Sequence, residues 1–269
     1  MSDDIAASIG PHQLSVRIIQ SSIDPDSAQQ HSIAAVSGVI EEVGADLAEA
    51  FHTGQEAIAF IPDTAASTGT VRANGNAVCH NPASIEHEQA ARMAAAFISA
   101  HAFVAKYNAL QQASHADTDK DIPTGTSIIL TGGETPTTAI ISLILRNADP
   151  DARILVTAEL DGEDKLIRRT DQYVIRFRAY YAIDGSAEDA FTHLEAASQH
   201  YTGSKKAKVI LDVSDMCTRR PELRDVLDDD GVLVQAGKVG APIDDKGMEN
   251  VVKALRVFLD SNASVLSEL

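Results

Sequence analysis

The second half of the sequence alternates apolar runs of strand type with segments of helical spacing, and no other feature limits the fold as strongly. Short continuous apolar runs are typical of strands buried on both faces of a parallel sheet, with helices between them as the covering layers. We therefore predict a doubly wound α/β fold for this half. The expected strands are 127–131, 152–158, 173–183, 207–213 and 231–237, and the expected helices are 137–148, 161–166, 187–200 and 221–227.

The first half has the pattern of a small all-β subdomain. Short β-type segments bounded by turn residues run from Gln13 to about Phe60, and one further extended stretch covers residues 70–80. An Ala-rich helix is predicted over residues 85–110, with a break near residues 97–101. This half therefore supplies a β subdomain and a connecting helix.

A polar stretch at residues 114–126 separates the two halves. We predict that residues 1–113 form the reduced β-rich subdomain with its connecting helix, and that residues 114–269 form the α/β domain. The α/β domain is expected to end in an amphipathic helix at residues 247–269, because apolar side chains recur there at helical spacing.

Charge and composition restrict the function. The 269 residues include 39 Asp and Glu against 22 Lys and Arg, and the formal net charge of −17 repels nucleic acid and anionic membrane surfaces. No apolar run approaches the ~18 residues of a membrane-spanning helix, and the acidic N-terminus lacks the apolar core of a signal peptide. We therefore expect a soluble, cytoplasmic protein that binds neither nucleic acid nor membranes.

The stretch Ile129–Ile141, ILTGGETPTTAII, begins like a loop that binds nucleotide phosphates. An apolar strand ends at Gly132 and Gly133, and helical spacing starts a few residues later, so that N–H groups at a helix start would face a ligand. Glu134 adds negative charge where phosphates would lie, and Pro136 has no N–H to donate. The sequence thus predicts a phosphate turn in the right position but with poor affinity.

The order of an all-β start, an Ala-rich helix and a nucleotide-type α/β half resembles the medium-chain dehydrogenase/reductase superfamily. Several segments resemble its enoyl-reductase and quinone-reductase branch, which includes enoyl reductases of polyketide and fatty-acid synthases. They span roughly residues 13–240 and are SSIDPDS (21–27), SGVIEEVGADLAEAFHTGQEAIAF (37–60), NPASIEHEQAARMAAAFISAHAFV (81–104), ILVTA (154–158), AKVILDVSD (207–215) and GVLVQAGKVG (231–240). The resemblance implies a Rossmann-like domain preceded by a reduced GroES-like subdomain.

The resemblance also implies a site for NAD(P). The family turn is typically A-x-G-G-V-G or G-x-G-x-x-G, whereas residues 135–138 here read TPTT. A carboxylate at Glu159 could hold a ribose diol and would oppose a 2′-phosphate, which favours NAD, although Lys165, Arg168 and Arg169 could reverse that preference. We expect either no cofactor or weak NAD(P) binding, through Gly132, Gly133, Thr137, Thr138, Glu159 and Gly237.

A catalytic zinc ion is not expected. Zinc-dependent branches of the superfamily carry Gly-His-Glu followed by Gly-x-Val, and the corresponding stretch here is HSIAAVSGV (31–39). Ala35 stands where the Glu would be, His31 is one residue out of register, and Cys79-His80 lies at a predicted strand end. We therefore predict no metal-ligating residues.

Four residues are candidates for catalytic roles. Asp24 and Asp26 lie in the stretch that resembles the family's substrate-facing loop, although an Asx turn beside Pro25 accounts for them as well. His101 lies where the family's helix faces the cleft and could act as acid or base, or could be a packed core residue. Lys238 follows a strand at the end of the sheet where ligands bind, or is a surface lysine.

These observations leave three functional hypotheses open. The first is an enoyl-reductase-like protein with impaired or lost NAD(P)-dependent reduction, which acts as a noncatalytic domain or partner of a biosynthetic synthase, or as a homodimer. The second is an active zinc-independent NAD(P)H-dependent reductase of an activated alkene or carbonyl. The third is a redox-independent isomerase or cyclase that reuses the pocket. A small acyl or carbonyl compound is the ligand that the resemblance implies.

Overall fold

The computed structural model describes residues 9–23, 33–62, 69–115, 126–158, 179, 181–204, 206–235 and 245–266. Its contacts divide the chain into two compact units, Met1–Ala95 with Pro242–Leu269, and Ala96–Ala241. The sequence placed the boundary at residues 113/114 and assigned the C-terminal helix to the α/β domain. The division by contacts differs in both respects.

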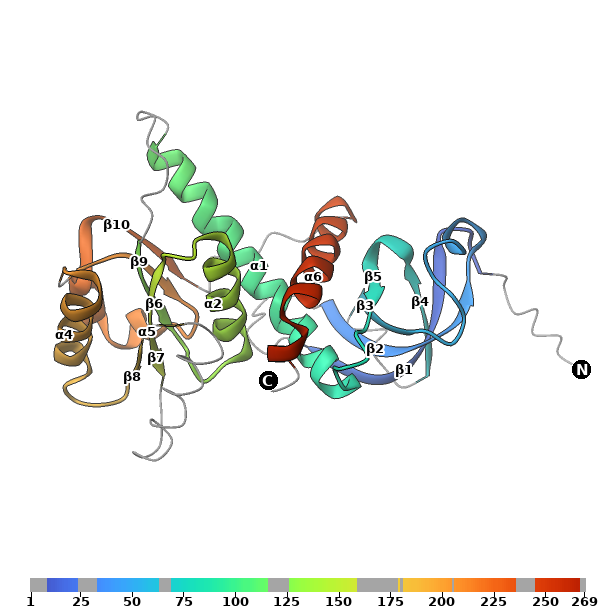
Figure 1. Cartoon of the computed structure of the whole chain (residues 1–269), viewed down its shortest axis with the longest axis horizontal. Coiled ribbons are helices and arrows are strands. Elements are labelled where there is room, and N and C mark those ends of the chain that lie inside the picture. The colour runs from blue at the N-terminus through green and yellow to red at the C-terminus, as the bar shows by residue number, and fades with distance from the viewer. Residues whose placement is uncertain are drawn as a thin grey trace, which may run out of the picture. The chain divides into compact units, whose positions relative to one another are not determined.

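The first unit contains an antiparallel five-stranded sheet with the order β4-β1-β2-β3-β5 (Figure 1). Leu14, Val36 and Ile40 are fully buried in its apolar core. This sheet confirms the predicted all-β subdomain. The strands are β1 Gln13–Ile23, β2 Ile33–Val43, β3 Glu56–Pro62, β4 Thr70–Asn74 and β5 Val78–His80, with short 3-10 turns at Ala45–Leu47 (η1) and Gly75–Ala77 (η3).

Helix α1, His87–His115, begins in the first unit and continues into the second as one helix. The predicted break near residues 97–101 is wrong. The helix contains neither Gly nor Pro, and its many Ala residues have the highest helix propensity, so nothing in the sequence interrupts the backbone hydrogen bonds.

Helix α6, Asp245–Leu266, confirms the predicted amphipathic helix. It contacts β5 and η3 of the first unit. Val251, Leu255 and Leu259 are buried on one face, whereas Val257 is 66% exposed. The contacts of this apolar face explain why the segment belongs with the β-rich unit and not with the α/β unit that precedes it in the chain.

The second unit contains a parallel five-stranded sheet with the order β10-β9-β6-β7-β8. Read from the opposite edge and numbered within the unit, this is the 3-2-1-4-5 order of a doubly wound nucleotide-binding fold. The α/β prediction is therefore confirmed. The strands are β6 Ser127–Thr131, β7 Arg153–Ala158, β8 Tyr181–Asp184, β9 Ala207–Asp212 and β10 Leu227–Gln235.

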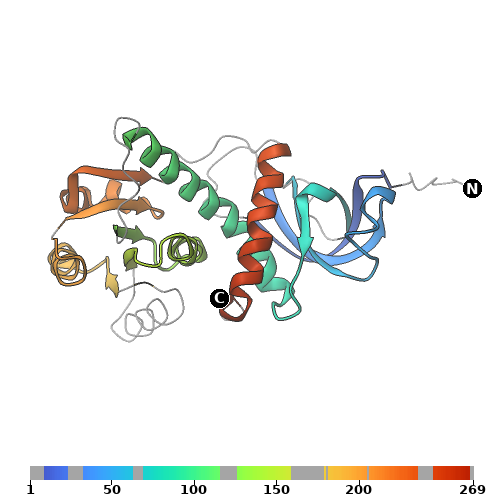
Figure 2. The ribbon, with the colours of Figure 1, turned by 45° about the horizontal axis from the view of Figure 1, so that its top comes forward.

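Helices α2 and α4 lie on opposite faces of this sheet (Figure 2). Right-handed crossovers require this arrangement, because the chain moves from β6 to β7 on one side of β6 and later returns to β9 on the other. The helical segments are α2 Pro136–Ala148, α4 Ala190–Thr202, α5 Met216–Arg219 and the 3-10 segment η5 Pro221–Val226. The helix predicted at residues 161–166 and most of the strand predicted at residues 173–183 lie outside the described residues.

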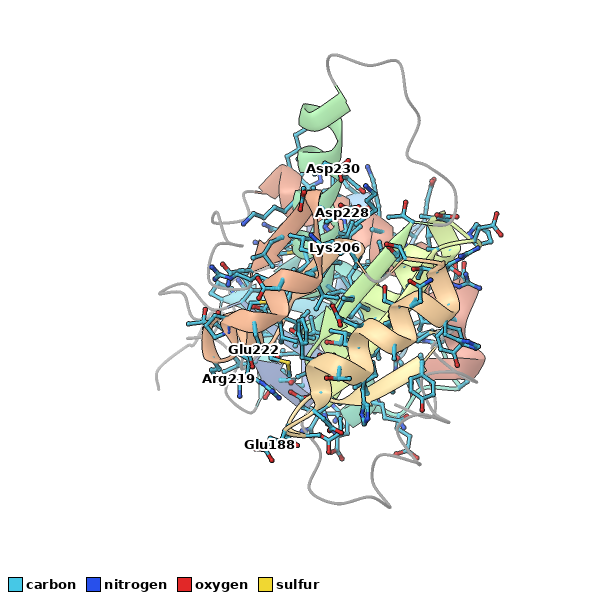
Figure 3. The ribbon with its side chains drawn as sticks, turned by 90° about the vertical axis from the view of Figure 1, so that its left-hand side faces the viewer. Glu188, Lys206, Arg219, Glu222, Asp228 and Asp230 are labelled. Carbon is cyan, nitrogen blue, oxygen red and sulfur yellow. The ribbon has the colours of Figure 1, made fainter. Side chains whose placement is uncertain are left out.

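The acidic run at residues 228–230 lies at one end of the α/β unit, while Arg219 and Glu222 lie at the other (Figure 3). Lys206 Nζ is 2.9 Å from Asp229, and Lys208 Nζ is 2.8 Å from Asp228 and 2.6 Å from Asp230. Because these groups are largely exposed, the pairs reduce local repulsion without adding much stability. Among the helices of the described residues, none has an apolar stretch long enough to span a membrane.

Candidate functional site

The switch point of the parallel sheet lies between β6 and β9. From β6 the chain proceeds to β7 on one side, and it returns later to β9 on the other. The loops that follow these two strands therefore diverge, and in open α/β sheets ligands bind outside the carboxyl ends of the strands at such a point. Here these loops carry Gly132 to Thr135 after β6 and Val213 to Asp215 after β9.

Gly132 and Gly133 both need the absence of a side chain. Gly132 has φ +80°, in the left-handed region, and an added Cβ would lie 3.1 Å from Ser214 Cβ. A Cβ on Gly133 would lie 2.6 Å from Val156 Cγ1 and 2.9 Å from Ala158 Cβ. The first glycine therefore permits the tight turn, and the second permits close packing of the turn on β7. Both are roles that glycines have in phosphate turns.

Several backbone N–H groups of the turn donate hydrogen bonds within the protein itself. The N–H of Gly133 donates to Thr157 O at 2.9 Å, and the N–H of Thr135 donates to Gly132 O at 2.9 Å. Thr135 Oγ1 accepts from the N–H of Thr138 at 3.3 Å and caps α2. Pro136, at the start of the helix, has no N–H. Four of the six backbone positions from Gly133 to Thr138 therefore have no uncommitted donor to offer a phosphate.

The predicted cofactor residues Thr137 and Thr138 come together with the two glycines at this turn, but both are buried. Thr138 Oγ1 donates to Thr131 O at 3.0 Å and lies 3.4 Å from the position that a Cβ on Gly132 would take. The space beside Gly132 is thus partly filled by Thr138 and Ser214.

Asp212, at the end of β9, is fully buried and connects the two loops of the switch point. Its Oδ1 accepts from Thr131 Oγ1 at 2.7 Å and from the N–H of Met216 at 2.7 Å. Its Oδ2 accepts from the N–H of Cys217 at 3.0 Å and faces Gln235 Nε2 at 3.5 Å. The buried carboxylate therefore ties β6 to β9 and fixes the start of α5.

Two arginines hold the segment that follows β9. Arg219 Nη2 donates to Ser214 O at 3.1 Å, and its exposed guanidinium brings positive charge to the loop that faces Gly132. Arg220 Nη1 donates to Gly185 O at 2.6 Å and to Ala187 O at 2.9 Å. These bonds fix the α5–η5 segment to the loop after β8.

Cys217 is a buried thiol beside Asp212. Burial first, and then the negative charge of Asp212, raises its pKa to about 12, and burial raises the pKa of Cys79 to about 12 as well. Because its pKa is raised, each thiol stays protonated to a higher pH in the folded protein than in the unfolded chain. Its contribution to the free energy of unfolding is therefore complete below the ordinary thiol pKa and decreases as the pH rises toward 12.

We accordingly expect Ellman's reagent to label the native protein at pH 8 at least about 100-fold more slowly than the urea-unfolded chain, since the thiolate is the reactive form. Labelling of both cysteines at similar rates in the two states would contradict the burial of these thiols. The same thiols should destabilise the fold above about pH 9, measured as a falling urea midpoint.

His101 lies on α1 and is half buried, with its ring centroid 6.0 Å from that of Phe97. Burial lowers the pKa of its imidazole, so the neutral form dominates at neutral pH. The imidazole of His101 thus packs beside the ring of Phe97. A catalytic role of His101 stays a prediction. The remaining predicted site residues lie outside the described residues: Asp24, Asp26, Glu159, Gly237 and Lys238.

Sequence reasoning missed the polar residues that shape the switch point: Thr131, Asp212, Ser214 and Arg219. A signal was present for Asp212, because an apolar strand that ends in a carboxylate, VILD, places that group at the carboxyl end of the sheet. Its partners could not be read from the sequence, because they come from three separate elements. Within the described part of the chain, no group of three or more His, Cys, Asp or Glu side chains is arranged to hold a metal ion.

Comparison with known proteins supports the fold. No protein-family model matches the sequence, and no curated protein matches it at a significant level. Among solved structures, the quinone oxidoreductase of Pseudomonas syringae pv. tomato DC3000 has a TM-score of 0.59 at 15% identity, over 99% of this chain and 83% of that one. The Escherichia coli quinone oxidoreductase, solved with NADPH, has a TM-score of 0.57 at 16% identity, over 96% and 82%. The CurK enoyl reductase has a TM-score of 0.57 at 14% identity, over 97% of this chain and 78% of that one.

Proposed function

We propose that this chain, which has the fold of medium-chain dehydrogenases/reductases, is an enoyl-reductase-like protein whose NAD(P)-dependent reduction is impaired or lost. It then serves as a noncatalytic domain or partner of a biosynthetic synthase in the cytoplasm. One observation carries the proposal: the β6–α2 turn uses the N–H groups of Gly133, Thr135 and Thr138 for internal hydrogen bonds.

A dinucleotide needs those donors. A pyrophosphate at a helix start is held by backbone N–H groups and by the positive end of the helix dipole. In this turn a phosphate would have to displace the bonds to Thr157 O and Gly132 O, and each displaced carbonyl would need a new partner. The net gain from phosphate contacts is therefore small.

The negative charge of Glu134 also weakens phosphate binding. Its carboxylate belongs to the turn itself, and a carboxylate about 6 Å from a phosphate opposes binding by roughly 1–3 kcal/mol at a protein surface. Arg219 offsets part of this repulsion, because its guanidinium is held at Ser214 O. The internal hydrogen bonds of the N–H donors and the negative charge of Glu134 both weaken phosphate binding. Together they favour the noncatalytic function.

An active zinc-independent reductase of an activated alkene or carbonyl is the second candidate. The left-handed Gly132, the close packing of Gly133 on β7 and the 3-2-1-4-5 strand order favour it, since these features suit a dinucleotide. Arg219 is the described cation nearest in sequence to the loop facing Gly132, and it would compensate part of a phosphate's charge.

Titration with NADH and NADPH separates the two candidates. The noncatalytic function predicts no saturable change in nicotinamide fluorescence and no thermal shift with either cofactor below about 1 mM. The Escherichia coli quinone oxidoreductase, which was solved with NADPH, is the positive control. Saturable binding at micromolar concentrations, with cofactor oxidation in the presence of an enone or quinone, would instead support the active reductase.

A further inference from the structure

Asn74, the last residue of β4, is the asparagine of this sequence that precedes a glycine. Every other asparagine precedes Ala, Pro or Val. An asparagine loses ammonia when the backbone nitrogen of the next residue attacks its side-chain carbonyl carbon. Glycine favours this attack, because it has no side chain to hinder the approach and its backbone rotates more freely. The pair Asn74–Gly75 is therefore the position where asparagine chemistry is fastest in the unfolded chain.

The reaction needs only water and hydroxide. The nitrogen of Gly75, after losing its proton to hydroxide, forms a bond to Cγ of Asn74, and the side-chain nitrogen leaves as ammonia. The product is a five-membered succinimide. Water then adds to one of the two ring carbonyls and opens the ring, which gives aspartate, or isoaspartate with the main chain running through the former side chain. The net change replaces NH₂ by OH, without oxidation or reduction.

The side chain of Asn74 is accessible for this reaction. Asn74 is exposed, and its side chain caps no backbone N–H group at the start of η3. The glycine is required by packing, because an added Cβ on Gly75 would lie 2.6 Å from Cδ1 and Cδ2 of Leu47. Leu47 itself packs against the apolar core of the sheet. The fold thus keeps a reactive pair of residues at an exposed turn.

The backbone around Gly75 opposes the reaction in the folded protein. The N–H of Gly75 donates to His12 O at 2.9 Å, so the proton that must leave is held in a hydrogen bond. Ring closure requires the C–N bond to Gly75 to lie nearly eclipsed with the Cα–Cβ bond of Asn74. The observed ψ of 142° turns the nitrogen well away from that position, and pairing of Asn74 with Gln13 in the sheet holds this conformation. Attack therefore requires local opening at the end of β4.

A change of the backbone at Asn74 affects a contact of α6. The segment η3, Gly75–Ala77, follows Asn74 directly and contacts α6. Isoaspartate lengthens the main chain by the side-chain CH₂ group, so the pairing of Asn74 with Gln13 and the position of η3 cannot both be kept. Aspartate adds a charge at an exposed position and leaves the length of the main chain unchanged. Isoaspartate is thus the product that disturbs η3.

We propose that Asn74–Gly75 is a site of spontaneous deamidation, that opening of the junction between β4 and η3 sets its rate, and that isoaspartate formed there weakens the packing of α6 on the β-rich unit. The site lies in the first unit, whereas the switch point of the parallel sheet belongs to the second. The proposal is therefore independent of whether reductase activity is lost.

Incubation of the full chain at alkaline pH, in the native state and in urea, tests the site when peptide mapping by mass spectrometry follows it. In urea, Asn74 should react at least about tenfold faster than Asn76, which precedes Ala. The native state should slow the reaction of Asn74 at least about tenfold, and hydrogen exchange of the Gly75 amide should be slowed by the same factor within about threefold, because both need the same opening. Asn74→Gln is the matched control, since its amide could only close a six-membered ring, and it should lose the reaction.

Hydrogen exchange of the buried α6 residues Val252 and Leu255 tests the consequence. Their amides should exchange at least about threefold faster in the aged chain than in Asn74→Asp or in equally aged Asn74→Gln. Because Asn74 is exposed, both variants should fold, which circular dichroism establishes.

Three results would overturn the proposal. The first is a reaction of Asn74 in urea that is no faster than that of Asn76. The second is a native-state rate that equals the rate in urea, or that is slowed while the Gly75 amide exchanges without protection. The third is exchange in α6 of the aged chain that matches Asn74→Asp, since isoaspartate would then leave the packing of α6 unchanged.

Discussion

Asp212→Ala should lower the free energy of unfolding of the α/β unit by about 3–5 kcal/mol. The carboxylate is fully buried and accepts hydrogen bonds from Thr131 Oγ1 and from the N–H groups of Met216 and Cys217. Alanine removes the acceptor and leaves these three donors without their partner. Urea unfolding followed by circular dichroism measures the change.

Two further variants make this result specific. Asp212→Asn keeps one acceptor oxygen and should lose about half as much. Asp229→Ala removes a carboxylate that is 95% exposed and should change stability by less than about 0.5 kcal/mol. If Asp212→Ala were no more harmful than Asp229→Ala, the hydrogen-bond network at the switch point could not hold the two loops together.

The double variant Glu134→Gly/Pro136→Gly should bind NADH or NADPH about 10- to 100-fold more tightly than the unchanged chain. It removes the carboxylate from the turn and restores an N–H at the first position of α2. Both changes favour a diphosphate at the helix start. Nicotinamide fluorescence during titration measures the affinity, and the thermal midpoint shows whether the turn is still folded.

Asp151→Gly is the matched control, because it removes one negative charge near the amino end of β7, at the opposite end of the sheet. The control should leave cofactor affinity unchanged. Equal gains in the control and the double variant would show that overall charge, and not the turn, limits binding. No gain in the double variant would contradict the prediction that the carboxylate of Glu134 and the missing N–H of Pro136 limit cofactor binding.

Most of the fold could be predicted from the sequence because its signals are local. The strand-type runs at residues 127–131 and 207–213 became β6 and β9 nearly as expected, since apolar runs between turn residues leave few alternatives. The partner of α6 could not be predicted in this way. Its apolar spacing indicates that one face is buried, but not that β5 and η3 are what it contacts.

Less of the candidate site could be predicted. Gly132 and Gly133 were correctly placed in the turn, because their roles follow from backbone geometry that only glycine permits. The network around Asp212 escaped prediction, because it joins residues far apart in sequence. Hydrogen bonds of this kind depend on strand register and sheet order, which the sequence pattern alone does not fix.

Amide chemical shifts measured by NMR during titration of the unchanged protein with NADPH test the central claim most directly. If the donors of the β6–α2 turn are committed to Thr157 O, Gly132 O and Thr135 Oγ1, the amide signals of Gly133, Thr135 and Thr138 should stay in place up to millimolar NADPH. Saturable shifts of these three signals at micromolar NADPH would show a diphosphate bound on the turn, and would contradict the account.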